Sequence, residues 1–392
     1  MMEIVFPDGI KYVLSRLENA GYSAFAVGGC IRDSLLARRP GDWDAASSAL
    51  PGEVMELFGP DALPTGLRHG TVTIKTPDGP IEVTTFRADG VYADHRRPDS
   101  VRFVGDIRED LSRRDFTINA MAVSLSGTLI DPFGGRDDLR KGLVRCVGDP
   151  ARRFEEDALR MFRALRFCAN LGFALDTDTL EAIHEKSALA SSLAAERIHV
   201  ELIKTIICQC SREIGIMLES GLFDRFCTGG EAVDFTPLDM LPERPLPRLA
   251  GLCVLLERAG RVRTPELLRA LKCSGEEIRL CSLAAEAALS GLPDSPAGWK
   301  RLLSRVGEPA ARTAAAAGQA LYGRDFLPQL EQVLVSGECF STDRLAVGGG
   351  DLLALGLRGR EVGAALERLL LHVIEHPEDN ERERLLLFFQ EK

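Results

Sequence analysis

Hydrophobic positions in the first third of the chain switch between helical and extended spacing. Residues 7–20 carry apolar side chains on one helical face and are followed by Gly21, a common residue after a helix end, so they predict an amphipathic helix. Farther along, apolar and polar residues alternate with the period of two that is typical of strands. We therefore expect a domain of the α+β class on a small sheet, with strands at 23–27, 71–75, 81–86, 101–104 and 121–125.

Beyond residue 150 this alternation largely disappears and helical spacing dominates. Segments that contain Pro and Gly at 236–247 and 291–298 separate groups of helices. The last segment, 348–392, is again helical and rich in leucine. The other expected helices cover 155–170, 178–185, 194–208, 212–219, 247–259, 264–271, 276–290 and 309–323.

The length of 392 residues is too great for a single ordinary core, so about two to four domains are expected. No run of about 18 apolar residues occurs, and the first six residues lack the basic start and the apolar core of a signal peptide. The ten cysteines show neither a disulfide framework nor zinc-ligand spacing. These features predict a cytoplasmic protein without a membrane partner.

The net charge of −10 at pH 7 does not favour nucleic acid as a partner, but basic residues concentrate in one segment. Between Arg140 and Arg166, eight lysines and arginines stand against four acidic residues, which gives a local charge of +4. RNA binding needs a basic surface only where the RNA backbone lies. The same pattern is typical of a solvated helix face, and the charge by itself favours that interpretation.

A glycine pair with a nearby arginine follows the first expected strand. Gly28 and Gly29 have no Cβ, so backbone N–H groups there can approach phosphate oxygens. Residues 31–36 directly afterwards are expected to form the start of a helix. The guanidinium group of Arg32 in this helix can donate two parallel hydrogen bonds to a phosphate. These residues predict a nucleoside triphosphate site, although a glycine pair by itself usually marks only a tight turn.

Asp42 and Asp44 come next, with one residue between them. In a strand, residues i and i+2 point to the same face, so we expect two adjacent carboxylates that can bind one or two divalent cations. Glu82 lies on another expected strand and could complete the cluster. The alternatives are a solvated turn for the aspartates and a surface glutamate on an edge strand for Glu82.

The segment 113–121 places several polar groups among apolar residues. Asp115 can accept a hydrogen bond from a ribose hydroxyl, Arg114 can pair with phosphate or orient Asp115, and Asn119 can both donate and accept. This pattern predicts contacts with the ribose side of a nucleotide. A buried ion pair that closes a helix onto the sheet explains it equally well.

Residues 154–167 have the spacing of one continuous helix, with Asp157, Arg160, Arg163 and Arg166 each three positions apart. Residues three apart are neighbours on a helix, so Asp157 and Arg160 would present an acceptor beside a donor fork. That pair matches the Watson–Crick edges of cytosine and adenine, whereas uracil and guanine would turn a carbonyl toward the carboxylate. An ordinary surface salt bridge is the simpler alternative.

Taken in order, these segments resemble the class II tRNA nucleotidyltransferases, the CCA-adding enzymes, a family that also includes bacterial poly(A) polymerases. The resemblance is strong from residue 22 to about 205 and weak beyond it. The matching segments are Gly28-Gly29-x-x-Arg32-Asp33 with Asp42-x-Asp44, Arg113-Arg114-Asp115-Phe116-Thr117-Ile118-Asn119-Ala120-Met121, Asp131-Pro132-Phe133-Gly134-Gly135, Glu156-Asp157-x-x-Arg160-x-x-Arg163, and Glu196-Arg197-Ile198 before Glu201-Leu202.

The resemblance implies a polymerase-β-like nucleotidyltransferase head with a small mixed sheet, followed by an all-helical neck, body and tail. On this chain these parts would cover 1–140, 141–207, 208–335 and 336–392, and the tail would bind tRNA. The family's roles imply that Mg²⁺ is held by Asp42 and Asp44, with Glu82 at a less constant third position. They also imply that the triphosphate is held by Gly28, Gly29 and Arg32, and that the ribose side is served by Arg114, Asp115 and Asn119.

The implied activity is the addition of C, C and A to tRNA 3′ ends from CTP and ATP, without a nucleic-acid template. Asp157 and Arg160 would select the base, and Arg163 and Arg166 would contact nucleotide phosphate or the tRNA end. Members that add only CC lack part of a flexible segment that is full length here at 86–103, where it contains Tyr92, Asp94, Arg96 and Arg97. The alternatives are an A-adding enzyme, a poly(A) polymerase, or a non-catalytic protein that binds nucleotide or RNA.

Overall fold

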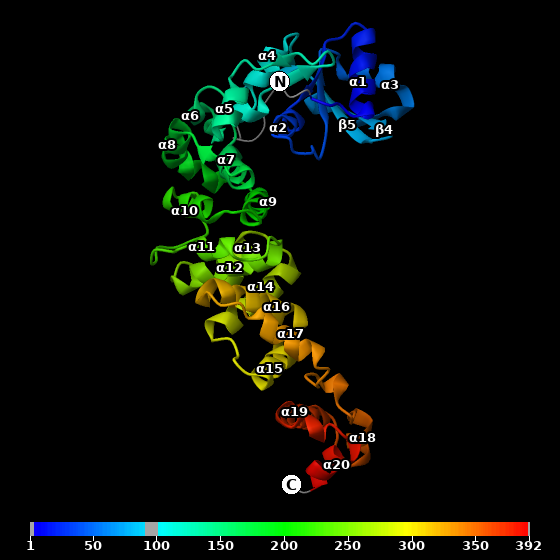
Figure 1. Ribbon diagram of the computed structural model, residues 1–392, viewed down its shortest axis with the longest axis vertical. Coiled ribbons are helices and arrows are strands. Elements are labelled where there is room, and N and C mark those ends of the chain that lie inside the picture. The colour runs from blue at the N-terminus through cyan, green and yellow to red at the C-terminus, as the bar shows by residue number, and fades with distance from the viewer. Residues whose placement is uncertain (1–3, 91–100, 391–392) are drawn as a thin grey trace. The chain divides into compact units, whose positions relative to one another are not determined.

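The computed structural model describes residues 4–90 and 101–390 (Figure 1). The chain forms two compact units. The first comprises Met1–Thr205 and Ile216–Phe223, and the second comprises Ile206–Gly215 and Asp224–Lys392. The finer division into four parts, with boundaries near 140, 207 and 335, stays a prediction.

A seven-stranded sheet forms the centre of the first unit. Within it β2 (Asp44–Ser47) and β5 (Gly79–Thr85) pair in parallel, and the other neighbouring strands pair antiparallel. The expected small mixed sheet and the α+β class are therefore confirmed. From edge to edge the strands are β3 (Ala62–Gly66), β4 (Thr71–Thr76), β5, β2, β1 (Ala24–Val27), β8 (Ala122–Ser124) and β9 (Leu129–Ile130).

Helices pack on this sheet through apolar faces. α1 (Asp8–Asn19) buries Ile10, Val13, Leu14 and Leu17 and contacts β1 and β2. Full burial of such a side chain stabilises the fold by about 1.5–3 kcal/mol. The other elements around the sheet are α2 (Gly29–Leu35), α3 (Pro51–Phe58), α4 (Ile107–Ser112), α5 (Gly135–Lys141) and the paired strands β6 (Arg87–Asp89) and β7 (Val101–Phe103).

The prediction of one continuous helix over 154–167 is wrong. The chain forms α6 (Pro150–Glu156) and then α7 (Leu159–Leu171), and Asp157 between them is extended, with φ −144° and ψ 103°. The Asp157 carboxylate accepts a hydrogen bond from the backbone N of Leu159 at 3.1 Å, which satisfies one of the N–H groups at the start of α7. Apolar residues keep a helical spacing across the break because α6 and α7 both bury side chains, among them Phe154 and Phe162, in the same unit.

The rest of this part of the chain is helical apart from one short strand pair. β10 (Leu143–Val144) and β11 (Ala174–Leu175) pair in parallel, and β11 falls in the region where only helices are expected. Two residues are too few to produce a recognisable alternation. The helices that follow are α8 (Thr177–Lys186), α9 (Ala195–Ile206) and α10 (Ser211–Glu219).

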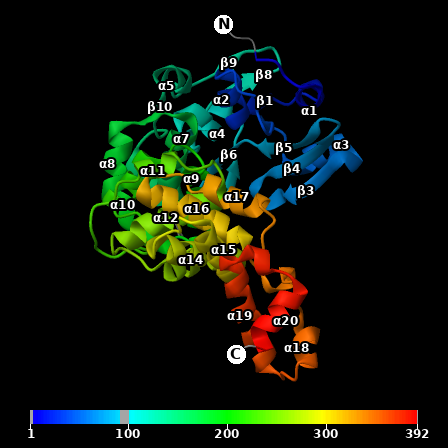
Figure 2. The same cartoon turned by 60° about the horizontal axis from the view of Figure 1, so that its bottom comes forward.

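The second unit consists of helices, as its sequence predicts. α16 (Glu308–Tyr322) is rich in alanine and buries Ala311, Ala314 and Ala315 against its neighbours α12 (Pro245–Arg258) and α14 (Gly275–Leu289), which lie beside it in Figure 2. The spacing missed α15 (Pro296–Val306), α17 (Leu327–Val335) and the single turn α11 (Thr236–Asp239), which falls in the segment 236–247 that was expected to separate groups of helices. The remaining helices are α13 (Thr264–Ala270), α18 (Gly349–Ala354), α19 (Arg360–Glu375) and α20 (Arg382–Gln390).

Over residues 4–90 and 101–390, every helix is either too short or too polar to span a lipid bilayer.

Candidate active site

A pocket of about 560 Å³ in the first unit collects nearly all of the predicted site residues. Strand β2, helices α2, α7 and α9, and the segment around 113–119 supply its walls. Of the predicted residues, Asp42 and the possible third carboxylate, Glu82, do not line it. The lining consists of Gly28, Gly29, Arg32, Asp44, Arg113, Arg114, Asp115, Asn119, Asp157, Leu159, Arg160, Arg163, Arg166, Phe167 and Arg197.

The glycine pair forms the turn between β1 and α2, which begins at Gly29 rather than near residue 31. Gly28 has φ +82° and ψ −135°, a conformation that residues with a Cβ rarely adopt. A Cβ at Gly28 would also come within 2.9 Å of Nη1 of Arg114. The turn therefore needs glycine both for its backbone conformation and for the close approach of Arg114.

Asp44 is the first residue of β2 and lies directly opposite Glu82 of the parallel neighbour β5. Although the side chain of Asp44 is exposed, desolvation by the surrounding protein is the main cause that raises the pKa of Asp44 to about 6. The charges of Glu82 and Asp42 raise it further, whereas Arg114 opposes them. Carboxylates that repel one another in this way fit a divalent cation, which would offset the repulsion. Asp44, Asp42 and Glu82 are therefore the residues that could hold a metal ion.

Asp42 lies before β2, so the expected relationship of Asp42 and Asp44 within one strand is wrong. The i and i+2 rule applies only where both residues are in the strand. The two carboxylates nevertheless interact, since the charge of Asp42 contributes to the raised pKa of Asp44. Asp42 reaches this position from the connection that precedes the strand.

A buried carboxylate that sequence reasoning missed orients two of the pocket arginines. Asp110 on α4 is fully buried and accepts hydrogen bonds from Nε and Nη2 of Arg113, at 3.0 and 2.8 Å. Nη2 of Arg114 lies 3.4 Å from the other oxygen of Asp110. The only sequence signal was the spacing of three and four residues between the aspartate and the arginines.

Asp115 forms the buried ion pair that was one of the two open interpretations. Its Oδ2 accepts hydrogen bonds from Nε of Arg163, at 2.9 Å, and from Nη2 of the same side chain. Burial alone would raise the pKa of Asp115, but Arg163, together with Arg160 and Asn119, lowers it to about 2. Asp115 is thus a carboxylate at any ordinary pH, and its contact with a ribose stays a prediction.

Asn119 connects this ion pair to the glycine turn. Its amide nitrogen donates to Oδ1 of Asp115 at 3.2 Å, and its amide oxygen accepts from Nη1 of Arg32 at 2.7 Å. Arg32 also donates from Nε to Asp33 at 2.9 Å. The side chains of the first two sequence motifs are therefore held in one hydrogen-bonded network on the pocket wall.

Asp157 and Arg160 both face the pocket, although not as neighbours on one helix. Oδ2 of Asp157 accepts from Nη2 of Arg197 on α9 at 3.0 Å. Arg160 is buried and donates to Oε2 of Glu156 at 2.8 Å and to the carbonyl oxygens of Arg153 and Arg113 at 3.2 and 3.0 Å. Base selection by Asp157 and Arg160 stays a prediction.

Arg166 and Arg163 pair with different carboxylates, Glu201 and Asp115. Nη1 of Arg166 lies 3.2 Å from Oε2 of the buried Glu201 on α9. Burial lowers the pKa of Arg166, and the nearby positive charges of Arg163 and Arg32 act in the same direction. The basic segment 140–166 is therefore not a uniform solvated face, because several of its arginines take part in buried or half-buried ion pairs.

Seven arginines and three aspartates line the pocket, so its wall carries a marked excess of positive charge. Such an excess suits a polyphosphate. Sequence reasoning gave no site role to Arg113, Phe167 and Arg197, although each stands inside or directly beside a quoted motif. Tyr92, Asp94, Arg96 and Arg97 lie outside the described residues.

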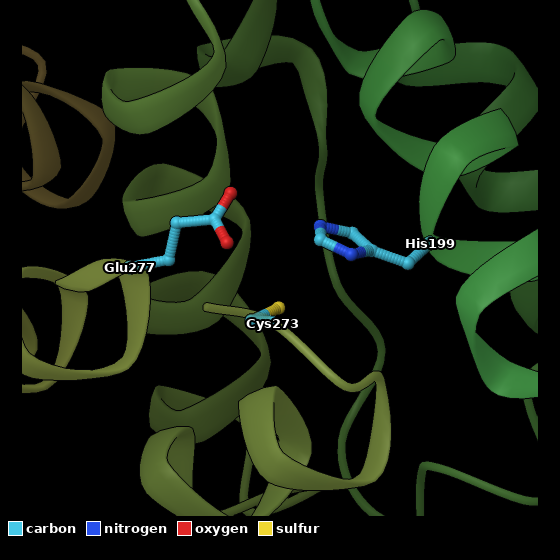
Figure 3. Close-up of side chains that lie close together, drawn as sticks. All are labelled: His199, Cys273 and Glu277. Carbon is cyan, nitrogen blue, oxygen red and sulfur yellow. The ribbon is translucent and has the colours of Figure 1, made fainter. Parts of the chain in front are cut away.

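A second set of possible ligands, drawn in Figure 3, does not extend this site. His199 on α9 belongs to the first unit, whereas Cys273 and Glu277 belong to the second. Within the second unit, Glu277 accepts from the backbone N of Ser274 at 2.7 Å and thereby caps α14. This is the ordinary role of an acidic residue in a capping box.

The mixed sheet and the arginine-rich pocket beside paired carboxylates define a nucleotidyltransferase with a polymerase-type head, a class whose chemistry uses divalent metal ions. A family model described as the poly A polymerase head domain matches residues 24–145. A second, described as the probable RNA and SrmB-binding site of polymerase A, matches residues 172–228.

Full-length relatives identify the family more narrowly. A CCA-adding enzyme of Limosilactobacillus fermentum is 36% identical over 379 residues, which cover 95% of this chain and 94% of that protein. One of Geobacillus stearothermophilus is 36% identical over 399 residues, with coverage of 97% and 96%. The crystal structure of the Bacillus stearothermophilus CCA-adding enzyme in complex with CTP superposes with a TM-score of 0.82 at 32% identity, covering 99% of this chain and 98% of that chain. The chain belongs to the family of CCA-adding enzymes.

Proposed function

We propose that this enzyme adds C, C and A to the 3′ ends of tRNA from CTP and ATP, with Mg²⁺ and without a nucleic-acid template. The observation that carries the proposal is the single pocket in which the glycine turn, Asp44, the Asp115 network and Asp157 with Arg160 meet. Full-length similarity to relatives named as CCA-adding enzymes supports it. The similar crystal structure with CTP supports the nucleotide.

The polyphosphate of the nucleotide would lie against the basic side of the pocket. Gly28 and Gly29 allow close approach of the backbone, and Arg32, Arg163 and Arg166 supply guanidinium groups. Asp115 accepts hydrogen bonds from the side chains of Arg163 and Asn119 and keeps both in place. Arg114 lies between the glycine turn and Asp110, from where it can contact the phosphate or the ribose.

The base would lie against Asp157 and Arg160. Cytosine and adenine each offer an amino group to a carboxylate and a ring nitrogen to a guanidinium, whereas uracil and guanine would present a carbonyl to Asp157. An unpaired buried polar group costs about 1–3 kcal/mol, enough to reject the wrong base. The protein itself would therefore replace a template strand.

The reaction is attack of the tRNA 3′-hydroxyl on the α-phosphorus of the nucleotide, in line with the departing pyrophosphate. Asp42 and Asp44 would hold Mg²⁺, with Glu82 as a third carboxylate beside Asp44. Bound there, the ion would lower the pKa of the hydroxyl and neutralise charge on the phosphates. The arginines of the pocket would stabilise the charge on the leaving pyrophosphate.

The helical parts beyond the pocket would hold the tRNA. The match of residues 172–228 to a probable RNA-binding site supports this assignment. We infer a tail at 336–392 that binds tRNA, and a cytoplasmic location, where tRNA, CTP and ATP meet. The ten cysteines are all free thiols, which fits a reducing compartment.

Incubation of the full chain with a tRNA that ends before the first C, with CTP, ATP and Mg²⁺, tests the proposal. The expected product is longer by three nucleotides, ends in CCA and does not grow further. A product that stops after CC, a run of AMP on any RNA, or addition of A only to a tRNA that already ends in CC would each contradict it. Unchanged turnover in the Asp42→Ala, Asp44→Ala double variant would exclude the metal site.

A further inference from the structure

Three guanidinium groups surround the aromatic ring of Phe167. The Cζ atoms of Arg166, Arg32 and Arg163 lie 4.3, 5.2 and 5.6 Å from the centre of that ring. Two of the arginines stand on α7 with Phe167, and Arg32 comes from α2. A cation within about 6 Å of a ring face is attracted by the electron density of the ring.

The ring itself is held firmly by the core. Phe167 is 8% exposed and meets the fully buried Phe116 edge to face, with 5.6 Å between ring centres and an interplanar angle of 77°. That arrangement is a favoured geometry for aromatic pairs. Phe167 also lines the pocket, so one part of the side chain is anchored while another faces the place where a ligand would bind.

The three arginines each have a carboxylate partner in addition to the ring. Arg163 pairs with Asp115, Arg166 with Glu201, and Arg32 with Asp33. The three guanidinium groups nevertheless repel one another, since the charges of Arg163 and Arg32 contribute to the lowered pKa of Arg166. An aromatic ring between like charges separates them, offers each a favourable contact and adds no charge of its own.

We propose that Phe167 is a positioning residue that holds Arg32, Arg163 and Arg166 apart and ready for the polyphosphate of a nucleoside triphosphate. The inference rests on the proposed function, because it takes a nucleoside triphosphate as the ligand of this pocket. Groups that are held in place before binding lose less conformational entropy when the ligand arrives. Since the ring meets the phosphate-binding arginines and not the base-selecting pair, its effect is the same for CTP and ATP.

Replacement of Phe167 by 3,4,5-trifluorophenylalanine withdraws electron density from the face of the ring and nearly keeps its shape, so it weakens the attraction between the ring and the arginines. We expect the KM for CTP and for ATP to rise by the same factor, about tenfold for three weakened contacts, with kcat within about twofold. The dissociation constant of inorganic tripolyphosphate, measured by calorimetry on the full chain, should rise by a similar factor. F167L should show the same change in KM, and F167Y, which keeps a ring, should restore it.

The matched control is the same fluorinated residue at Phe162. That side chain is also buried on α7, but it packs against the ring of Phe223, with 6.3 Å between centres. Its substitution should leave both KM values unchanged. The melting temperature of the fluorinated Phe162 variant should equal that of the wild type, because its shape is conserved. That of the fluorinated Phe167 variant should fall by about 2–4 °C, because the weakened cation contacts already exist in the free protein.

Three results would overturn the proposal: an unchanged KM in the Phe167 variant, a change for only one of the two nucleotides, or a change of melting temperature alone. If the proposed function itself is wrong, the results differ from these three. In that case the wild type adds no CCA, while the fluorinated Phe167 variant still binds tripolyphosphate more weakly than the wild type.

Discussion

Nη2 of Arg197 donates a hydrogen bond to Oδ2 of Asp157 at 3.0 Å, across 40 positions of the chain. Asp157 belongs to the extended break between α6 and α7, whereas Arg197 stands on α9. The second terminal nitrogen of Arg197, Nη1, is buried and has no hydrogen-bond partner in the described part of the chain. The orientation of the proposed base-selecting carboxylate thus depends on a distant helix.

Arg197→Ala should weaken base selection. Without its partner, the Asp157 carboxylate is free to rotate, and the preference for CTP over UTP should fall by about tenfold, the worth of one hydrogen bond to a charged group. The measurement is the ratio of kcat/KM for the two nucleotides on a tRNA that lacks CCA.

Lys204→Ala on the same helix is the control, because Lys204 is exposed and does not line the pocket. It should leave the ratio unchanged even if tRNA binding weakens. A ratio in Arg197→Ala equal to that of the wild type would show that Asp157 keeps its place without the arginine.

Asp44→Asn should abolish most of the activity without harm to the fold. Loss of one ligand of the proposed metal site should lower kcat by about 10²–10³-fold. The substitution also removes a charge that Glu82 and Asp42 repel, so the melting temperature should stay the same or rise. Single-turnover addition of C and thermal unfolding measure the two effects.

Asp61→Asn, at an exposed aspartate of the same unit, should change neither quantity. Activity of Asp44→Asn above a tenth of the wild-type value would contradict the assignment of Asp44 as a metal ligand.

Asp115 should make the stability of the first unit depend on pH. Its pKa falls from 3.8 to about 2 on folding, so the carboxylate stabilises the folded state above about pH 4, and this contribution disappears as the pH falls toward 2. The shift corresponds to about 2 kcal/mol at neutral pH. Asp115→Asn should therefore lower the free energy of unfolding at pH 7, and its difference from the wild type should shrink between pH 4 and 2.

Denaturant unfolding at several pH values measures this difference. Asp137→Asn serves as the control, because Asp137 forms only an exposed pair with Arg140. Such pairs contribute little. A constant difference between wild type and Asp115→Asn from pH 7 to 2 would contradict the proposed role of the ion pair in stability.

The two glycines of the β1–α2 turn should differ in their tolerance of alanine. Gly28→Ala should destabilise the fold by about 1–3 kcal/mol, since its backbone conformation is strained for any residue with a Cβ. It should also raise the KM for both nucleotides, because the new methyl group would displace Arg114. Gly29→Ala should be nearly neutral in stability, as its nearest neighbour is the flexible end of Arg32 at 3.6 Å.

Thermal unfolding and initial rates compare the two variants directly. Equal melting temperatures for Gly28→Ala and Gly29→Ala would show that the turn can adopt another conformation.

Local patterns predicted those parts of the fold whose cause is local. The strand at 71–76 was found because Val72 and Ile74, both fully buried, alternate with polar threonine and lysine residues. The break at Asp157 was missed because nothing in the spacing of 154–167 distinguishes one helix from two. What stabilises the break is a carboxylate that caps α7 and pairs with Arg197, a residue from another helix.

The types of side chain in the site were likewise predicted, but not all of their partners. The paired acids, the glycine turn and the arginines stand in the sequence, and the structure brings all but Asp42 to one pocket. Asp110 was missed because an aspartate on a short helix carries no mark of burial until α4 packs on the sheet. Sequence reasoning also assigned no site role to Phe167, and the contact of its ring with Arg32 exists only after α2 and α7 come together.

Sequence alone therefore determined the fold class, the family and the chemical types at the site, because these follow from local spacing and from residues that stand close together in the chain. Tertiary structure decided which carboxylate meets which guanidinium, where the helix breaks and which ring lies among the arginines. The physical reason is that burial and charge pairing act over a few ångströms in space, whatever the separation along the chain.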